Sequence, residues 1–517
     1  MRTARVHGIS LAGTEADLVT VEARFERADR QRTEVVLSGL PDPVIRESRG
    51  RLLSALEANR LRLPPGRLTL NLTPAGRRKT GESLDLPLAL GAAAAAGHLT
   101  PDAGAGALFL GELGIDGRLY AVPGGLAAAE LARRTGLAAI VAAPATASEA
   151  ACLPGVNALA ARDLAQVVRW AATGEGLAAA PPTSGAEGDG AAAREEGLRR
   201  AAAALAGIRG QEAGKRAAVV AAAGGHGLLL VGPPGAGKSL LARALVHLLP
   251  PPSLEERLEI TRVLSAAGRW PRGLAAERPF RAPHHTTSYA GLVGGGNPPA
   301  PGEITLAHRG VLFLDELPEL KREALEALRQ PLESGSVLLS RSRHWIELPA
   351  AFLLVAAMNP CPCGYHGHPA VPCRCSPAEI RRYHQRISGP LLDRIELRVE
   401  LPAPPVAALA PAAPGALPGL LPAAAALPAA VARASAHRAA RQGRVPNAML
   451  EAADLDRWAP LGPSARRLLE RAAAQRGLSG RALQSLRRVA RTLADLEAEE
   501  RPDDRHFAEA LALRASI

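Results

Sequence analysis

The residues best suited to chemistry lie in Leu228–Ser239, LLLVGPPGAGKS. Four apolar residues predict a buried strand, and the Gly/Pro-rich turn after them leads into a helical pattern over Leu240–Leu249. The stretch matches G-x-x-x-x-G-K-[ST] in a strand–turn–helix context, which a chance Gly-rich turn would lack. Lys238 can reach the β- and γ-phosphates of a nucleoside triphosphate, and the Ser239 hydroxyl can ligate Mg²⁺. The predicted contacts of this phosphate loop are Gly232, Pro233, Pro234, Gly235, Ala236, Gly237, Lys238, Ser239 and Leu240.

Two further apolar strands end in residues that can act on the phosphates. Val311–Leu314 is followed directly by Asp315 and Glu316. Asp315 is placed to hold the hydration shell of Mg²⁺, and Glu316 to polarise the attacking water. Leu353–Met358 ends at Asn359, whose amide can orient the same water. The sequence therefore predicts an ATP site that uses Mg²⁺.

Two arginines are candidates for stabilising charge in the transition state. Arg394 could point from one subunit into the nucleotide of its neighbour. A local ion pair with Asp393 or Glu396 is the alternative. Arg481 follows the predicted N-cap Ser479 and could reach the γ-phosphate. An apolar stripe of that helix comprises Leu483, Leu486, Val489, Ala490, Leu493 and Leu496.

Four of the five cysteines fall within fifteen residues. They form two C-x-C pairs with nine residues between them: Cys361, Cys363, Cys373 and Cys375. Four thiolates can close on one tetrahedral Zn²⁺, and His366 or His368 could replace one of them. Because four protein ligands leave no open position, the predicted zinc is structural. Free or redox-active thiols are the alternative.

The charge balance points to an anionic partner. The 62 basic and 50 acidic residues give a formal charge of +12, which favours nucleic acid, although an arginine-rich composition without such a partner is the alternative. Val337–Leu348 reads as a hairpin with Arg341, Arg343 and His344 at its turn. We predict that Arg341 and Arg343 contact DNA phosphates; a merely solvated turn is the alternative. The histidine pair in Arg281–Ser288 lacks a third metal ligand, so this segment is predicted to be a moving loop near a pore.

The N-terminus, MRTARVHGIS, lacks the apolar run of a signal peptide. Pro402–Ala432 is uncharged and long enough to span a bilayer, but its eight prolines exclude a spanning helix. We therefore expect a cytoplasmic protein with no membrane contact.

Residues 1–172 predict an α+β domain, with strands at Asp17–Phe25, Thr33–Leu40 and Arg67–Leu72 among others and a helix at Pro43–Asn59. Its segments GESLDLPLAL, from Gly81, and VPGGL, from Val122, resemble the proteolytic domain of Lon and the related domain of the RadA recombination protein.

In Lon the first segment holds a serine nucleophile and the helix after Gly-Gly-Leu holds a lysine. Here that helix reads AAAE up to Glu130, so no lysine can activate a serine, and Ser83 is displaced from the nucleophile position. We expect a non-proteolytic scaffold or DNA-docking module; peptidase activity is the alternative.

The remaining boundaries follow composition. We predict a flexible linker at 173–196, a nucleotide-binding α/β core at 197–401 that includes the cysteine insert 361–375, an Ala/Pro-rich linker at 402–432, and a helical lid at 433–517.

The whole chain resembles the magnesium-chelatase-like AAA+ proteins of the ComM type. The resemblance is carried by GPPGAGKS, PHHTTS, VLFLDE, MNPCPCG, the CRCSPAEI–RISGPLLDRIEL run and LSGRALQSLRRVARTLADLE. It implies a Lon-like N-terminal domain, an AAA+ P-loop core and a helical lid over the nucleotide. It also implies that Lys238, Ser239, Asp315, Glu316 and Asn359 act in one subunit, with Arg394 supplied in trans and Arg481 as lid sensor. By the same resemblance, the backbone around Ile208 and Gln211 holds the adenine.

Proteins of this type act as homohexameric, ATP-driven DNA helicases. They migrate branched junctions while single strands are integrated in natural transformation, so recombination proteins are possible partners. The alternative is a protein-remodelling ATPase that loads Mg²⁺ into a porphyrin, as the related chelatase subunit does. That subunit lacks both a Lon-like domain and a four-cysteine insert, which disfavours this alternative.

Overall fold

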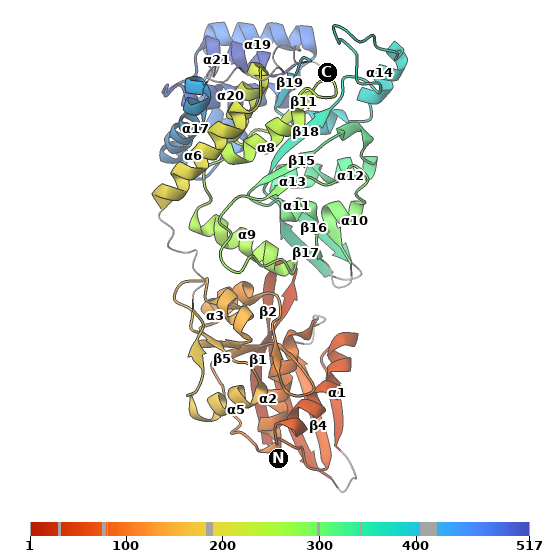
Figure 1. Cartoon of the computed structure of the whole chain (residues 1–517), viewed down its shortest axis with the longest axis vertical. Coiled ribbons are helices and arrows are strands. Elements are labelled where there is room, and N and C mark those ends of the chain that lie inside the picture. Colours follow the sequence, from red (N-terminus) through yellow and green to blue (C-terminus); the bar gives the residue numbers. More distant parts are fainter. Residues whose placement is uncertain are drawn as a thin grey trace, which may run out of the picture.

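The computed structural model describes residues 2–28, 33–74, 79, 81–181, 190–296, 300–341, 344–403 and 421–515. These residues form an elongated body. An N-terminal part lies at one end, and a larger part with a parallel sheet and a layer of C-terminal helices lies at the other (Figure 1). The mixed α/β architecture with a helical C-terminus agrees with the sequence prediction.

The N-terminal part is built on an eight-stranded sheet in the order β10-β9-β8-β5-β1-β2-β4-β3. The long hairpin of β1 and β2 runs antiparallel through its centre. The Ala-rich helix α2 is buried against this hairpin, where Gly91 lies close to Val21 and Ala23. The elements are β1 (Arg2–Ala12), β2 (Glu15–Arg27), β3 (Glu34–Ser38), α1 (Pro43–Ala58), β4 (Gly66–Thr73), α2 (Asp85–Ala96), β5 (Ala107–Leu110), β6 (Glu112–Leu113), β7 (Leu119–Tyr120), α3 (Gly125–Thr135), β8 (Ala139–Ala142), α4 (Pro144–Ala150), β9 (Ala158–Ala160), α5 (Leu164–Thr173) and β10 (Ala178–Ala179).

The second sheet is wholly parallel, in the order β12-β15-β18-β11-β19. Successive side chains of a strand point to opposite faces. In β11, accordingly, Leu228 and Leu230 join one core while Leu229 and Val231 join another. Burial on both faces explains why the three central strands β15, β18 and β11 are continuously apolar. The elements are α6 (Gly190–Ala206), α7 (Glu212–Gly224), β11 (Leu228–Val231), α8 (Lys238–Leu248), α9 (Leu254–Ala266), β12 (Phe280–Arg281), α10 (Tyr289–Val293), β13 (Gly294–Gly295), β14 (Ala300–Pro301), α11 (Glu303–Leu306), β15 (Val311–Leu314), α12 (Arg322–Ala327), α13 (Arg329–Ser334), β16 (Ser336–Arg341), β17 (His344–Pro349), β18 (Leu353–Met358), α14 (Pro377–His384), α15 (Gly389–Leu392) and β19 (Leu397–Glu400).

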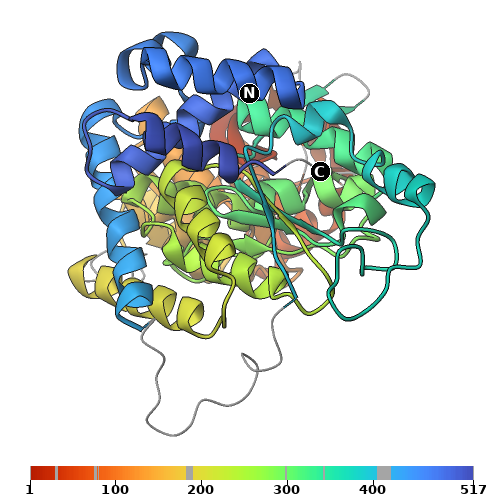
Figure 2. The same cartoon turned by 90° about the horizontal axis from the view of Figure 1, so that it is seen from above.

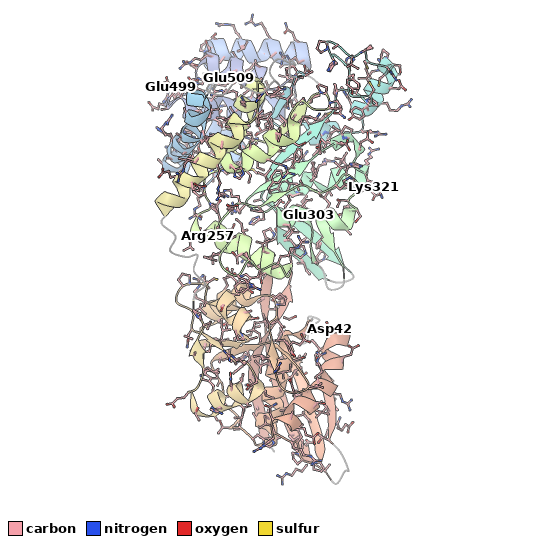
Figure 3. All side chains as sticks on the ribbon, viewed as in Figure 1. Asp42, Arg257, Glu303, Lys321, Glu499 and Glu509 are labelled. Atoms are coloured by element: carbon pink, nitrogen blue, oxygen red, sulfur yellow. The ribbon has the colours of Figure 1, made fainter. Side chains whose placement is uncertain are left out.

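The C-terminal helices continue the core on the α6–α8 side of the parallel sheet. Seen from above, they form a layer beside α6, α7 and α8 (Figure 2). Arg216 of α7 pairs with Glu509 of α21, with its Nε 2.7 Å from Oε1; Glu509 is labelled in Figure 3. The elements are α17 (Leu421–Gln442), α18 (Ala452–Trp458), α19 (Pro463–Arg476), α20 (Gly480–Leu496) and α21 (Asp504–Ala512).

A buried polar network attaches α20 to the parallel sheet. His226 lies just ahead of β11, with only Gly227 between them. Its Nε2 is 2.7 Å from the hydroxyl of Thr492, and its Nδ1 contacts the Glu396 carboxylate. Asn447 donates to the same hydroxyl at 3.0 Å. Because buried polar groups are costly without partners, this network requires α20 to sit in one position.

The N-terminal part contacts the rest of the chain chiefly through α9. The Ser265 hydroxyl accepts from the backbone N–H of Gly124 at 2.9 Å, and Arg262 pairs with Glu130 at 2.8 Å. Glu149 is 2% exposed at this contact and accepts from the N–H of Leu126 at 2.8 Å. Burial raises the pKa of Glu149 above its ordinary value, although these hydrogen bonds oppose the shift. Arg257, labelled in Figure 3, lies on the same helix.

Two of the predicted segments differ in the structure. Helix α6 begins at Gly190 and β10 pairs with β9, so part of the predicted linker 173–196 is ordered. Helix α17 begins at Leu421, within the predicted linker 402–432. Alanine-rich sequence has high helix propensity, and α6 and α17 pack against each other, which explains both.

No helix in the described part of the chain combines the length and apolar character that crossing a bilayer requires.

Candidate nucleotide site and cysteine cluster

The phosphate loop follows β11, at the carboxyl end of the parallel sheet. Gly237 adopts φ +87° and allows the tight entry into α8, which begins at Lys238. The Lys238 ammonium donates to the carbonyls of Gly232 and Pro233 at 2.6 and 3.0 Å and to Asn359 Oδ1 at 3.0 Å. All three of its donors are therefore satisfied by the protein, and ATP would replace these acceptors with phosphate oxygens. Burial lowers the pKa of Lys238 below its ordinary value, whereas Asp315 and Glu316 act in the opposite direction.

The residues predicted to hold Mg²⁺ lie together. The Ser239 hydroxyl donates to Asp315 Oδ2 at 3.1 Å. These are hard oxygen donors at the phosphate loop, and a Mg²⁺ that keeps several waters needs only one or two protein oxygens. The donor set thus fits the predicted ion.

Glu316 lies at the same edge of the sheet in an unusual conformation. Its φ of 50° is in the left-handed region, which is uncommon for a residue other than glycine and clusters at functional sites. Its Oε2 lies 2.9 Å from Nδ1 of His285. The predicted loop with the histidine pair therefore reaches the nucleotide site, a contact that the sequence did not predict.

The segment predicted to hold the adenine lies near the phosphate loop. Ile208 is buried in the core, and the side-chain amide of Gln211 donates to the Pro402 carbonyl at 2.7 Å. Leu401, the preceding residue, lies against Gly232, where a Cβ would lie 2.5 Å from the Leu401 carbonyl oxygen. The chain after β19 thus connects the Ile208–Gln211 segment to the phosphate loop.

Arg394 and Arg481 lie together at the opposite end of the sheet. Both guanidinium groups contact Glu333, Arg481 at 2.7 Å. They line a cavity of about 570 Å³ that also includes Gly227 and Gly310, the residues just before β11 and β15. From Gly227 to Gly232 the strand spans about 16 Å, at about 3.3 Å per residue. The structure thus places Arg481 beside Arg394 and away from Lys238 of the same chain.

The four cysteines form one cluster immediately after Asn359. Their sulfur atoms all lie within 4.8 Å of one another. Three of the pairs are 3.3, 3.6 and 3.7 Å apart. Four sulfurs about 2.3 Å from a tetrahedral Zn²⁺ would be about 3.8 Å apart, so the cluster fits this ion. The His368 ring instead accepts from the N–H groups of Ala370 and Val371.

The basic hairpin is present, and its two faces differ. Arg341 ends β16, and Arg343 lies outside the described residues. On one face, Ile346 and Leu348 lie against Gly13 in the β1–β2 turn of the N-terminal part. On the other, Trp345 is 69% exposed. Trp345 was not among the residues predicted to contact DNA, although an aromatic residue beside a basic turn is a recognisable signal for nucleic-acid contact.

In the N-terminal part, Ser83 is buried and its hydroxyl donates to the carbonyl of Ile9 at 3.0 Å. Helix α3 carries Glu130, which faces Arg262 of α9. That the domain is non-proteolytic stays a prediction, and this arrangement agrees with it.

Comparison with known proteins covers nearly the whole chain. Residues 204–409 match the family "Magnesium chelatase, subunit ChlI", residues 21–146 match "Subunit ChlI of Mg-chelatase", and residues 423–514 match "Magnesium chelatase, subunit ChlI C-terminal". The protein YifB of Salmonella typhimurium is 39% identical over 523 residues, which cover 100% of this chain and 97% of YifB. The competence protein ComM of Haemophilus influenzae is 37% identical over 526 residues, covering 100% of this chain and 98% of ComM.

The chain belongs to the ComM/YifB family of magnesium-chelatase-like proteins. This confirms the family expected from the sequence and places the protein among AAA+ ATPases. Similarity to a magnesium-chelatase subunit itself is narrower: the 67 kDa subunit of Heliobacterium mobile is 31% identical over 233 residues, 38% of this chain. The ComM/YifB family thus accounts for the N-terminal part, the nucleotide site and the C-terminal helices together.

Proposed function

We propose that this protein is a homohexameric, ATP-driven DNA motor that migrates branched DNA during the integration of incoming single strands. The observation that carries the proposal is the separation of two sets of residues by the parallel sheet. At one end of the sheet lie Lys238, Asp315, Glu316 and Asn359. At the other end lie the guanidinium groups of Arg394 and Arg481. Residues that cannot meet in one chain can meet across an interface between two copies.

Within one subunit, the roles follow from the contacts. Lys238 exchanges the carbonyls of Gly232 and Pro233 for the β- and γ-phosphates, and Ser239 and Asp315 hold Mg²⁺. A Mg²⁺ held by these two residues would neutralise charge on the phosphates. Glu316 takes a proton from the attacking water, which Asn359 orients.

Across the interface, Arg394 and Arg481 of one subunit approach the γ-phosphate of the next. Arg394 is only 10% exposed, and its Nε has no hydrogen-bond partner among the described residues. Glu333 holds both guanidinium groups near each other in the isolated chain. A neighbour's triphosphate would compete with Glu333 as a stronger anionic acceptor, because paired guanidinium groups suit phosphate geometry.

DNA binding is assigned to the β16–β17 hairpin. Arg341 and Arg343 would contact phosphates and Trp345 would stack on an exposed base, as basic and aromatic residues do in proteins that bind single strands. The net charge of +12 supports a polyanionic partner. The competence protein ComM is similar to this chain over its full length, and its name supports a role in DNA uptake or in the steps that follow uptake.

The experiment is an annealed four-way DNA junction with one fluorescent strand, mixed with the protein, Mg²⁺ and ATP. We expect strand exchange that needs ATP, and ATP hydrolysis that rises when junction DNA is added. The Glu316→Gln variant, which keeps the phosphate loop, is the matched control and should support neither. Electron micrographs with a non-hydrolysable nucleotide and forked DNA should show six-membered rings. No exchange and no DNA-stimulated hydrolysis would refute the proposal.

A second candidate is a protein-remodelling ATPase of the magnesium-chelatase type. The match to the 67 kDa chelatase subunit favours it, but that match covers 38% of this chain against 100% for ComM and YifB. Insertion of Mg²⁺ into a porphyrin in the presence of chelatase partner subunits would establish it.

A further inference from the structure

The cysteine cluster is built against the phosphate loop, not at a distance from it. Cys361 is fully buried and lies two residues after Asn359, the side chain that accepts from Lys238. In the same insert, Gly364 adopts φ +86° and packs on the loop: a Cβ there would lie 2.8 Å from Pro234 and 3.9 Å from the Asn359 side chain. The insert therefore contacts both the loop and its amide partner.

The chain after the cysteine cluster returns to the residues around Asn359. Helix α14 begins one residue after Ser376, which follows Cys375 and caps the helix together with Glu379. Its last residue, His384, has Nε2 2.9 Å from the Pro360 carbonyl. Tyr383 is buried in the same hydrophobic core as Met358, the residue before Asn359. Asn359 is thus held on one side by α14 and on the other by the cysteine cluster.

Backbone groups surround the sulfurs as they do in thiolate–metal sites. The N–H of His366 donates to Cys361 Sγ at 3.3 Å, and the N–H of Cys375 donates to Cys373 Sγ at 3.4 Å. Such bonds hold a ligand in place and stabilise its negative charge. Without an ion, three or four thiolates this close would repel one another, so the geometry of the insert depends on what they bind.

We propose that the four cysteines bind one Zn²⁺ whose task is to position Asn359 and the phosphate loop, so that ATP binding depends on the metal. Four protein ligands would leave the ion no open position for ATP or water. Cys361 fixes the backbone of Asn359 at its end of β18, and Gly364 sets the position of Pro234. This inference rests on the ATP site of the proposed function and is independent of its DNA step.

The first test measures metal content and nucleotide affinity in the full-length protein without DNA. Mass spectrometry of the purified chain should find one zinc and no iron per chain. Cys375→Ser should lose the metal and bind a fluorescent ATP analogue about tenfold more weakly or worse, which corresponds to about 1.4 kcal/mol. Cys375→His should keep both, since histidine is also a zinc ligand. Cys152→Ser is the control, because Cys152 lies in the N-terminal part, outside the cluster.

The second test separates positioning from folding. Gly364→Ala should keep the zinc but weaken nucleotide binding, because the added methyl group meets Pro234. Gly367→Ala is its matched control: this glycine is in the same insert at φ +77°, and no atom of the described residues lies within 4 Å of the added methyl group. The backbone strain of the two substitutions is similar, and only the contact with the loop differs.

The outcomes distinguish the inference from the proposed function. Unchanged nucleotide affinity in zinc-free protein, equal affinities of the two glycine variants, or a chain that binds no zinc would each overturn the inference while leaving DNA-stimulated hydrolysis intact. Zinc-dependent ATP binding without any response to DNA would uphold the inference and refute the motor.

Discussion

Replacing Arg394 with alanine tests whether the ATP site is shared between copies. In the structure Arg394 donates to the Pro390 carbonyl at 2.6 Å and contacts Glu333, at the end of the sheet where the strands begin. The phosphate loop lies at the other end, about 16 Å away along β11 at about 3.3 Å per residue. An arginine side chain cannot bridge that distance. A direct contact of Arg394 with the reacting phosphate would therefore require a neighbouring copy.

The magnitude follows from charge stabilisation in the transition state. Loss of an arginine finger lowers phosphoryl transfer by about 10³-fold or more. Lys238→Ala should also abolish turnover, since the phosphates lose their cation. When the two variants are mixed in equal amounts and allowed to reassemble, a site works wherever a subunit with Lys238 meets a neighbour with Arg394. That combination occurs at about one quarter of the interfaces in a ring of identical contacts.

The assay is steady-state ATP hydrolysis of each variant alone and of mixtures at constant total protein. We expect almost no activity from either variant and about one quarter of the wild-type rate from the equal mixture. A mixture of Lys238→Ala with Glu316→Gln is the control. Lys238 and Glu316 of one site belong to the same subunit. Every subunit in this mixture therefore has a defective site of its own, whichever neighbour it meets. Recovery in the control, or none in the test mixture, would refute a shared site.

Three further predictions concern other parts of the chain. Glu316→Gln should bind ATP normally but hydrolyse it about 10²- to 10⁴-fold more slowly, because the water loses its base; normal turnover would contradict its assignment. Trp345→Ala should weaken binding to single-stranded DNA by about 1 to 3 kcal/mol, the value of one base stacked on an aromatic ring, and remove most of the tryptophan fluorescence quenching by DNA. Tyr120→Ala, a change at an aromatic residue that is 50% exposed in the N-terminal part, should do neither. For Glu149, burial raises the pKa in the folded state, so its favourable contribution is complete at low pH and is lost as pH rises through that pKa. The stability of Glu149→Gln relative to wild type should therefore increase as pH rises above about 4.5. A difference in melting temperature between the two proteins that is the same at every pH would contradict this.

Much of the nucleotide site could be predicted because its signals are local. Strands β11, β15 and β18 are short apolar runs. Asp315 and Asn359 follow β15 and β18 directly, and Lys238 follows β11 after the short phosphate loop. Parallel strands end at one edge, so order along the chain was enough to bring these residues together. Ser479 likewise caps α20 as predicted, accepting from the N–H of Ala482 at 3.2 Å, because a cap depends on about four consecutive residues only.

Strand β1 escaped prediction for the opposite reason. Its sequence, RTARVHGISLA, mixes small and polar residues, and its pairing partners lie in β2 and β5. The start of α17 within a proline-rich segment was also missed, since its packing against α6 and α20 outweighs composition. Long-range contacts of this kind leave little trace in a short window of sequence.

The local chemistry can be read from the order of the residues alone: a phosphate loop, two apolar strands followed by predicted catalytic residues, and four thiols at metal-binding spacing. Which of these residues lie close together follows from the fold. In the fold, Arg481 and Arg394 both contact Glu333, and His285 lies beside Glu316. The cysteine insert packs on Pro234 of the phosphate loop through Gly364. The physical reason is that hydrogen-bond caps, turns and hydrophobic periodicity act over a few residues. The position of a helix such as α20 depends on buried contacts made by residues hundreds of positions apart, such as His226 and Thr492.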